Sequence, residues 1–255
     1  GALTQVQPLD DVIVTGVDST AATAGGTIVG YAWELIEKPL ESSVVLATAN
    51  AMQTGFTFES GFTTVNGIDV AGTFVVRLTV TDSNGLVSTN DARVTLNAIP
   101  SEALHVQLTW DSPENDIDLH MKKQPGNYCD STLSCYYVNC REDDFSRPEF
   151  DGVGNSSTPG DPVLDIDDLD GFGPEHISID QTAAGAYNGG VHMYTYDETT
   201  FATIKIFVNG ALREELVKEM TADDQHWEVA EIEWNAGAAI VTPVDTIQGG
   251  GICGN

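Results

Sequence analysis

Positively charged side chains are scarce in this sequence. Its 255 residues include 10 lysines and arginines against 39 aspartates and glutamates, a formal net charge of -29. Binding to phosphate backbones needs a basic surface, so this balance argues against nucleic acid as a partner. Divalent cations are the natural counter-charge for such a chain, and clusters of oxygen ligands suit calcium.

Long apolar runs are also missing. No segment approaches the roughly 20 consecutive apolar residues that a helix needs to cross a bilayer, so we expect no direct membrane insertion. The hydrophobic content of 41% is nevertheless enough for a packed core. The length allows one large domain or two of ordinary size.

Catalytic motifs are absent as well. The sequence contains neither an H-E-x-x-H pair nor a G-x-S-x-G turn. His120, His176 and His192 lie in motifs of the second half, but histidines on strands are more often structural than catalytic. We therefore expect a non-enzymatic protein, and a metal-dependent hydrolase using His120 and the aspartates is the least favoured alternative.

Cysteine is limited to four residues. Cys129, Cys135 and Cys140 lie in "CDSTLSCYYVNC", and Cys253 lies in the C-terminal "QGGGICGN". The even number predicts two disulfide bonds and hence an extracellular or cell-surface location, because the C-x5-C-x4-C spacing does not suit a zinc site. Of the three pairings, we expect Cys129–Cys135 and Cys140–Cys253, the second one holding the tail.

The first hundred residues alternate like strands. In "FVVRLTVT", residues 74–81, Phe74, Val76, Leu78 and Val80 point one way and Arg77, Thr79 and Thr81 the other, which predicts a half-buried antiparallel strand. The turn "DSNG" follows, and "LVSTNDARVTL" returns as the next strand. Upstream, "IVGYAWELI" places Tyr31 and Trp33 on one face.

These segments resemble a PKD-type domain, an immunoglobulin-like β-sandwich common in extracellular proteins. The resemblance covers about residues 5–97 and rests on "GGTIVGYAWEL" with Trp33 and on "AGTFVVRLTVTDSNG". The usual G-D-G after the tryptophan is replaced by "ELIEKPLESS", so no ligand site is carried over. We place this domain at residues 1–99 and end it in "NAIPSEA".

Residues 100–255 predict a second, larger antiparallel β-sandwich with long loops, so the chain is expected to be all-β. "LHVQLTW" alternates, and Asn209-Gly210 is a strong hairpin signal after "TIKIFV". The segment 211–220 suits a helix or a strand, and the turn before it favours a strand. Residues 122–158 read as irregular loop.

Carboxylates gather at two places in this second domain. "NDIDLH" puts Asp116 and Asp118 on one strand face, and "LDIDDLDG" does the same for Asp165 and Asp167. We expect these groups to meet and bind one or two calcium ions; the alternative is a solvated acidic rim. The full set of expected ligands is Asp116, Asp118, Asp165, Asp167, Asp168, Asp170 and Glu175. The EF-hand pattern fails, because the fifth and twelfth positions from Asp165 are Leu169 and His176.

Residues 104–235 resemble an uncharacterised family of secreted bacterial proteins that is abundant in myxobacteria. The shared motifs are a tryptophan followed by D-x-D-L-H, then "LDIDDLDGFGPEHI", then "GAYNGGVH". The resemblance implies a β-sandwich in a secreted or surface-displayed protein and no established activity.

Tyrosines lie beside the acidic loops in the sequence. Tyr136, Tyr137, Tyr194 and Tyr196 suit a sugar-binding platform next to calcium, or ordinary packing. The sequence thus predicts a calcium-stabilised adhesion or interaction module whose partner is a surface protein or a glycan. A calcium-dependent carbohydrate-binding module is the main alternative.

Overall fold

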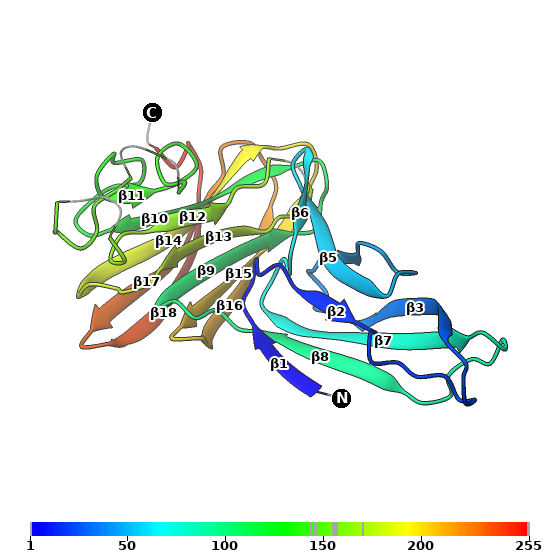
Figure 1. The fold of residues 1–255 in the computed structure, drawn as a ribbon. Helices are drawn as coiled ribbons and strands as arrows, with labels where there is room; N and C mark the ends of the chain where they lie inside the picture. Colours follow the sequence, from blue (N-terminus) through cyan, green and yellow to red (C-terminus); the bar gives the residue numbers. More distant parts are fainter. Residues whose placement is uncertain (1, 143, 145–146, 155–157, 170, 254–255) are drawn as a thin grey trace. The chain divides into compact units, whose positions relative to one another are not determined.

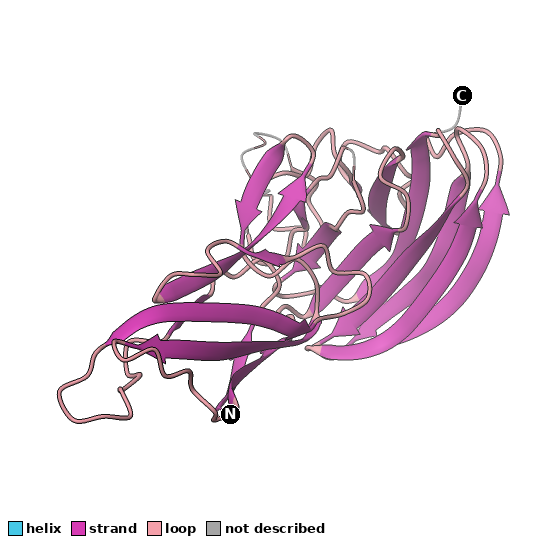
Figure 2. Ribbon diagram, turned by 90° about the vertical axis from the view of Figure 1, so that its right-hand side faces the viewer, coloured by secondary structure: helices cyan, strands magenta, loops and turns pink. Residues whose placement is uncertain are grey.

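The computed structural model describes residues 2–142, 144, 147–154, 158–169 and 171–253. The described chain consists of strands and loops, which confirms the predicted all-β class (Figure 2). It divides into two compact units, residues 1–59 with 63–99 and residues 60–62 with 100–255. Within the described residues, no helix is long and apolar enough to span a membrane.

The first unit contains two sheets (Figure 1). One has the order β1 (Ala2–Val6), β8 (Ala92–Ala98), β7 (Gly72–Asp82) and β3 (Ile28–Glu37). The other has the order β2 (Ile13–Thr15), β5 (Gln53–Ser60) and β4 (Val45–Leu46), with β6 (Thr63–Asn66) paired to β5. The predicted strand 74–81 and its returning partner are β7 and β8, and Phe74, Leu78 and Trp33 are buried as the alternation predicts.

Asp69 anchors a loop of the first unit. Its carboxylate is fully buried and accepts hydrogen bonds from the Ser42 hydroxyl (2.7 Å) and the Val44 amide (3.1 Å). Burial raises the pKa of Asp69, and these hydrogen bonds counteract part of that rise. The side chain therefore fixes the segment 42–44 at the cost of a buried charge.

We expect Asp69→Ala to lower the free energy of unfolding of the first unit by about 2–4 kcal/mol, because buried donors lose their acceptor. Calorimetric unfolding of the full chain measures this loss. Asp18→Ala, at an exposed aspartate of the same unit, is the control and should change stability by no more than roughly 0.5 kcal/mol. Equal losses in the two variants would contradict the anchoring role.

The second unit also contains two sheets, and all strand neighbours in them are antiparallel. The first sheet has the order β11 (Ser134–Cys135), β10 (Asp116–Lys123), β14 (Gly185–Thr195), β17 (His226–Asn235) and β18 (Ala238–Gln248). The second has the order β12 (Val163–Ile166), β13 (Glu175–Ile179), β9 (Leu104–Trp110), β15 (Thr200–Val208) and β16 (Ala211–Met220). The segment 211–220 is thus a strand, as the Asn209-Gly210 turn predicts.

Alternation on β10 decides which residues face the core. Ile117, Leu119 and Met121 belong to the hydrophobic core of the second unit. Because side chains alternate along a strand, Asp118 and His120 lie on the opposite face of the sheet. The polar residues of β10 therefore form an outer row, and Tyr128 and Tyr136 pack against His120 in this row.

Both disulfide bonds are present, but the expected pairing is wrong. The structure joins Cys129 to Cys253 (Cα–Cα 5.3 Å) and Cys135 to Cys140 (Cα–Cα 5.0 Å). The reason is a tight turn after β11, closed by a hydrogen bond from the Asn139 amide to the Tyr136 carbonyl (3.1 Å). This turn returns Cys140 to Cys135 and leaves Cys129 to hold the tail after β18.

Candidate metal centre

In the second unit, the neighbouring strands β10, β14 and β17 carry a row of polar side chains on the outer face of their sheet. Asp118 on β10 lies directly opposite His192 on β14, which lies opposite His226 on β17. His120 follows Asp118 on the same face, and its partner across the ladder is Gly190. A Cβ atom at Gly190 would lie 2.8 Å from the Tyr128 ring, so this glycine lets Tyr128 cover the row.

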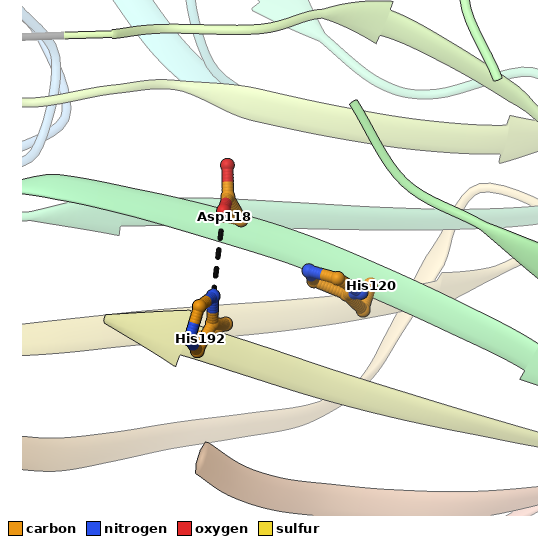
Figure 3. A group of neighbouring side chains, drawn as sticks. All are labelled: Asp118, His120 and His192. Carbon is orange, nitrogen blue, oxygen red and sulfur yellow. Dashed lines mark ion pairs between the residues drawn. The ribbon is translucent and has the colours of Figure 1, made fainter. Parts of the chain in front are cut away.

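Asp118, His120 and His192 form a compact group (Figure 3). Each offers one ligand atom, and these atoms all lie within 4.8 Å of one another. The Asp118 Oδ2 atom is 3.5 Å from Nδ1 of His192, whose Nε2 is 3.3 Å from Oδ1 of Asp224. We call Asp118, His120 and His192 the imidazole site.

His120 is buried without a hydrogen bond. Only 1% of the residue is exposed, and neither ring nitrogen has a hydrogen-bond partner among the described residues. Its ring stacks on Tyr136 with centroids 5.1 Å apart and meets Tyr128 edge-on at 6.2 Å. Burial lowers the pKa of His120 well below its usual value, so the ring is neutral and carries a free lone pair.

Carboxylates gather on the other side of Asp118. Asp118, Asp167 and Glu175 each place one oxygen within 4.8 Å of the other two. Glu175 begins β13, is 1% exposed and accepts a hydrogen bond of 2.6 Å from the Leu119 amide of β10. Asp116 adds a fourth group, and we call Asp116, Asp118, Asp167 and Glu175 the carboxylate cluster.

The charge of the carboxylate cluster is poorly balanced. Burial raises the pKa of Glu175 well above its usual range, and the charges of Asp118 and Asp167 raise it further. Burial, followed by repulsion from Asp118 and Asp167, also raises the pKa of Asp116 to about 7. Arg141 pairs with Asp167, and His192 lies beside Asp118. When all four carboxylates are ionised, the two basic groups beside them leave negative charge in excess.

The structure brings most of the expected metal ligands together. Asp168 lies next to the carboxylate cluster, is buried, and accepts a hydrogen bond from the Gly173 amide (2.9 Å). Asp165 is not part of the cluster: its side chain is exposed and lines a groove of about 890 Å³ with Glu102 and Asp180. Asp170 lies outside the described residues.

Asp165 and Asp167 were expected to share one face of a strand, but β12 ends before Asp167. β12 stops at Ile166, and its pairing with β13 shifts register between Leu164 and Ile166. Asp167 therefore belongs to the following loop and does not share a strand face with Asp165.

The expected ligand set contained no histidine, and His120 was named only in the least favoured alternative, a metal-dependent hydrolase. The D-x-D-L-H motif does contain a signal, because Asp118 and His120 are two residues apart on one strand. His192 joins them only through the pairing of β10 with β14. No sequence signal pointed to Asp224, which lies in the turn before β17.

The four tyrosines play different roles. Tyr136 packs on His120, and Tyr137 meets both Tyr136 (5.5 Å) and Tyr194 (5.6 Å) edge-on. Tyr196 packs against the hydrophobic core, whereas Tyr194 is 52% exposed. Tyr136 and Tyr137 therefore wall the imidazole site, and Tyr194 is the ring most available to solvent.

A third acidic group is explained by its own hydrogen bonds. Glu149, Asp151 and Asp161 place oxygens within 4.8 Å of one another. Asp161 accepts hydrogen bonds from the Phe150 amide (2.7 Å) and the Thr158 hydroxyl (2.8 Å). This group organises the loop before β12.

Comparison with known families agrees with the expectation for the first half. Residues 1–96 match the family model of the K319L-like PKD domain, which confirms the PKD-like assignment of this region. No curated protein and no solved structure matches the chain. A PKD domain combined with two disulfide bonds is typical of extracellular proteins. The resemblance of residues 104–235 to the myxobacterial family stays a prediction.

Proposed function

We propose that the protein is a non-enzymatic extracellular interaction module whose second unit is stabilised by calcium bound at the carboxylate cluster. The observation that carries this proposal is the gathering of Asp118, Asp167 and Glu175, with ligand oxygens within 4.8 Å of one another. Such a group is unstable when fully ionised, because like charges repel and burial weakens their solvation.

Calcium suits the donors and the local backbone. It takes 6–8 oxygen ligands in irregular geometry and accepts backbone carbonyls from loops. Asp167 comes from the loop after β12, Glu175 from the start of β13, and Asp116 and Asp118 from β10. An ion held by these groups ties β10 of one sheet to the β12–β13 segment of the other. Its role is therefore structural: it fixes loops that repulsion would otherwise open.

The PKD domain supports the interaction role. Residues 1–96 belong to a type of domain found as a module of extracellular proteins, and the calcium-stabilised unit that follows adds a second rigid surface. We propose adhesion to a surface protein or a glycan as the biological outcome.

We expect calcium to raise the melting temperature of the chelator-stripped protein by about 5–10 °C at a calcium concentration of 100 times the dissociation constant. Binding to the folded state alone contributes about 2.7 kcal/mol under that condition, and each kcal/mol shifts the melting temperature of a chain of this size by roughly 2–4 °C. Calorimetry with calcium, with magnesium and with chelator measures the effect.

Two variants make this test specific. The paired Asp116→Asn and Asp167→Asn variant should lose the calcium response, because it removes two charged ligands. Asp165→Asn is the matched control, since that aspartate lies outside the carboxylate cluster, and it should keep the response. If stripped wild-type protein melts at the same temperature with and without calcium, the carboxylate cluster is a solvated acidic rim.

A calcium-dependent carbohydrate-binding module is the second candidate. The observation that favours it is Tyr194, a half-exposed ring that touches Tyr137 beside the imidazole site. A glycan array probed in calcium and in chelator would support this alternative if calcium-dependent binding disappears in Tyr194→Ala. Binding that survives this substitution would remove the role of Tyr194.

A further inference from the structure

We propose that Asp118, His120 and His192 form a second, chemically distinct metal site, which takes a borderline divalent transition-metal ion such as zinc. In this site Asp224 is a positioning residue that orients His192. The proposal goes beyond calcium binding at the carboxylate cluster, because it assigns another ion to two histidines that this cluster does not use.

The donor set is the first argument. One carboxylate oxygen and two imidazole nitrogens suit zinc and its neighbours in the first transition row, whereas calcium prefers oxygen ligands. In a tetrahedral zinc site with bonds of about 2.1 Å, ligand atoms lie about 3.4 Å apart. Oδ2 of Asp118 and Nδ1 of His192 are 3.5 Å apart, which is already the edge of such a tetrahedron.

The buried imidazole of His120 is the second argument. Both its nitrogens lack a hydrogen-bond partner among the described residues, although only 1% of the residue is exposed. Leaving a buried polar group unsatisfied costs about 1–3 kcal/mol. Figure 3 shows one of these nitrogens turned toward the space between Asp118 and His192. An ion in that space satisfies His120 and also Oδ2 of Asp118, which likewise has no hydrogen bond among the described residues.

The contact between His192 and Asp224 is the third argument. Nε2 of His192 lies 3.3 Å from Oδ1 of Asp224, so this carboxylate accepts a proton held on Nε2, and Nδ1 is the ring nitrogen that faces Asp118. In the metal-free protein a proton on Nδ1 pairs His192 with Asp118, and a bound metal ion takes the place of that proton. Metal-binding histidines commonly donate their other N–H to a carboxylate in this way.

Asp224 is itself held in place for this task. Its amide donates to the Met193 carbonyl of β14 (3.0 Å), and its φ of 57° lies in the left-handed region. A non-glycine residue in that region marks a constrained turn. The turn therefore presents Asp224 to the imidazole of His192, one residue before Met193.

The two sites share Asp118 and otherwise use separate ligands. In Figure 3 one oxygen of Asp118 is directed to His192 and the other points away from it. The carboxylate can therefore bridge two ions, with Asp167 and Glu175 on the calcium side and the two histidines on the other. If one of the two ions does not bind, binding of the other ion can therefore still be tested.

The test is a titration of the chelator-stripped full chain with zinc, and with cobalt as a visible-absorption probe. We expect calorimetry to give a stoichiometry of one zinc ion per chain. The bound cobalt ion should show the d–d absorption bands that are typical of a low coordination number. His120→Phe preserves the stack on Tyr136 but removes both nitrogens, so it should lower zinc affinity by about 100-fold or more. Asp224→Asn should lower zinc affinity by about 10–100-fold, the usual loss for an outer carboxylate.

Two control variants distinguish the imidazole site from a nearby histidine and from the carboxylate cluster. His226→Phe removes a neighbouring histidine that is not part of the imidazole site and should keep zinc affinity within a few-fold. Asp167→Asn should lose the calcium response and keep zinc binding. Zinc binding that is absent, or that is equally strong in His120→Phe, would overturn the proposal.

A measurement on the wild-type chain covers the case in which His120→Phe does not fold. Zinc should shift the imidazole nitrogen resonances of two of the five histidines, His120 and His192. If zinc leaves both of these resonances unchanged, the site does not exist.

Discussion

We expect the paired Cys129→Ser and Cys253→Ser variant to lose about 5 kcal/mol of unfolding free energy in the second unit. The bond joins residues 124 apart in the sequence, and cross-linking a loop of this length removes about that much chain entropy from the unfolded state. The Cys135–Cys140 bond spans a separation of 5 residues, for which the same relation gives about 2 kcal/mol. The two disulfides should therefore differ strongly in their contribution.

The position of the long-range bond adds to its effect. Cys253 follows β18, an edge strand whose side chains are mostly exposed and which has little core contact of its own. Cys129 follows Tyr128, whose ring covers Gly190 and whose hydroxyl is 3.1 Å from Glu228. Removing the bond should thus loosen both the edge strand and the cover of the imidazole site.

Urea unfolding in chelator measures this prediction without a contribution from bound ions. The paired Cys135→Ser and Cys140→Ser variant is the matched control, because it also removes one disulfide and two sulfur atoms. Hydrogen exchange should show faster opening of β18 amides only in the Cys129/Cys253 variant. If both variants lose the same free energy, the long loop is not the source of the stabilisation.

The core strands were predictable because the order of apolar and polar residues along each of them indicates which side chains are buried. Apolar and polar residues alternate along most of β7, β9 and β15, and the Asn209-Gly210 turn sets the β15–β16 hairpin. β18 was not predicted, because most of its side chains are exposed and Pro243 interrupts it. Pro243 lies at a register shift on this edge strand, where proline does no harm to the ladder. An exposed edge strand forms because it pairs with its neighbour in the sheet. Its own sequence pattern therefore does not reveal it.

The candidate site was predictable only where ligands share a strand. Asp116 and Asp118 were placed on one face correctly, since alternation fixes side-chain direction along β10. The meeting of Asp118 with His192 depends on strand register, and the meeting with Glu175 depends on how two sheets approach. Such long-range contacts come from tertiary packing. The acidic composition therefore suggested a metal site made of carboxylates, but the expected ligand set did not include the two histidines.

Asp118→Asn should have the largest effect on ion binding of any single substitution, because Asp118 belongs to both proposed sites. The amide keeps the shape of the side chain but lacks the charge and the second ligand oxygen. We expect this variant to lose the gain in unfolding free energy that calcium gives and also the gain that zinc gives. At 100 times each dissociation constant these increments amount to about 2.7 kcal/mol apiece, or about 5 kcal/mol together.

Calorimetric melts in chelator, in calcium, in zinc and in both ions test this expectation. In chelator, Asp118→Asn should melt close to wild type, because the loss of the His192 contact is offset by weaker repulsion from Asp167 and Glu175. Asp167→Asn should lose only the calcium increment, and His120→Phe only the zinc increment. If Asp118→Asn retains either increment in full, that ion binds elsewhere, and Asp118 does not bridge the two sites.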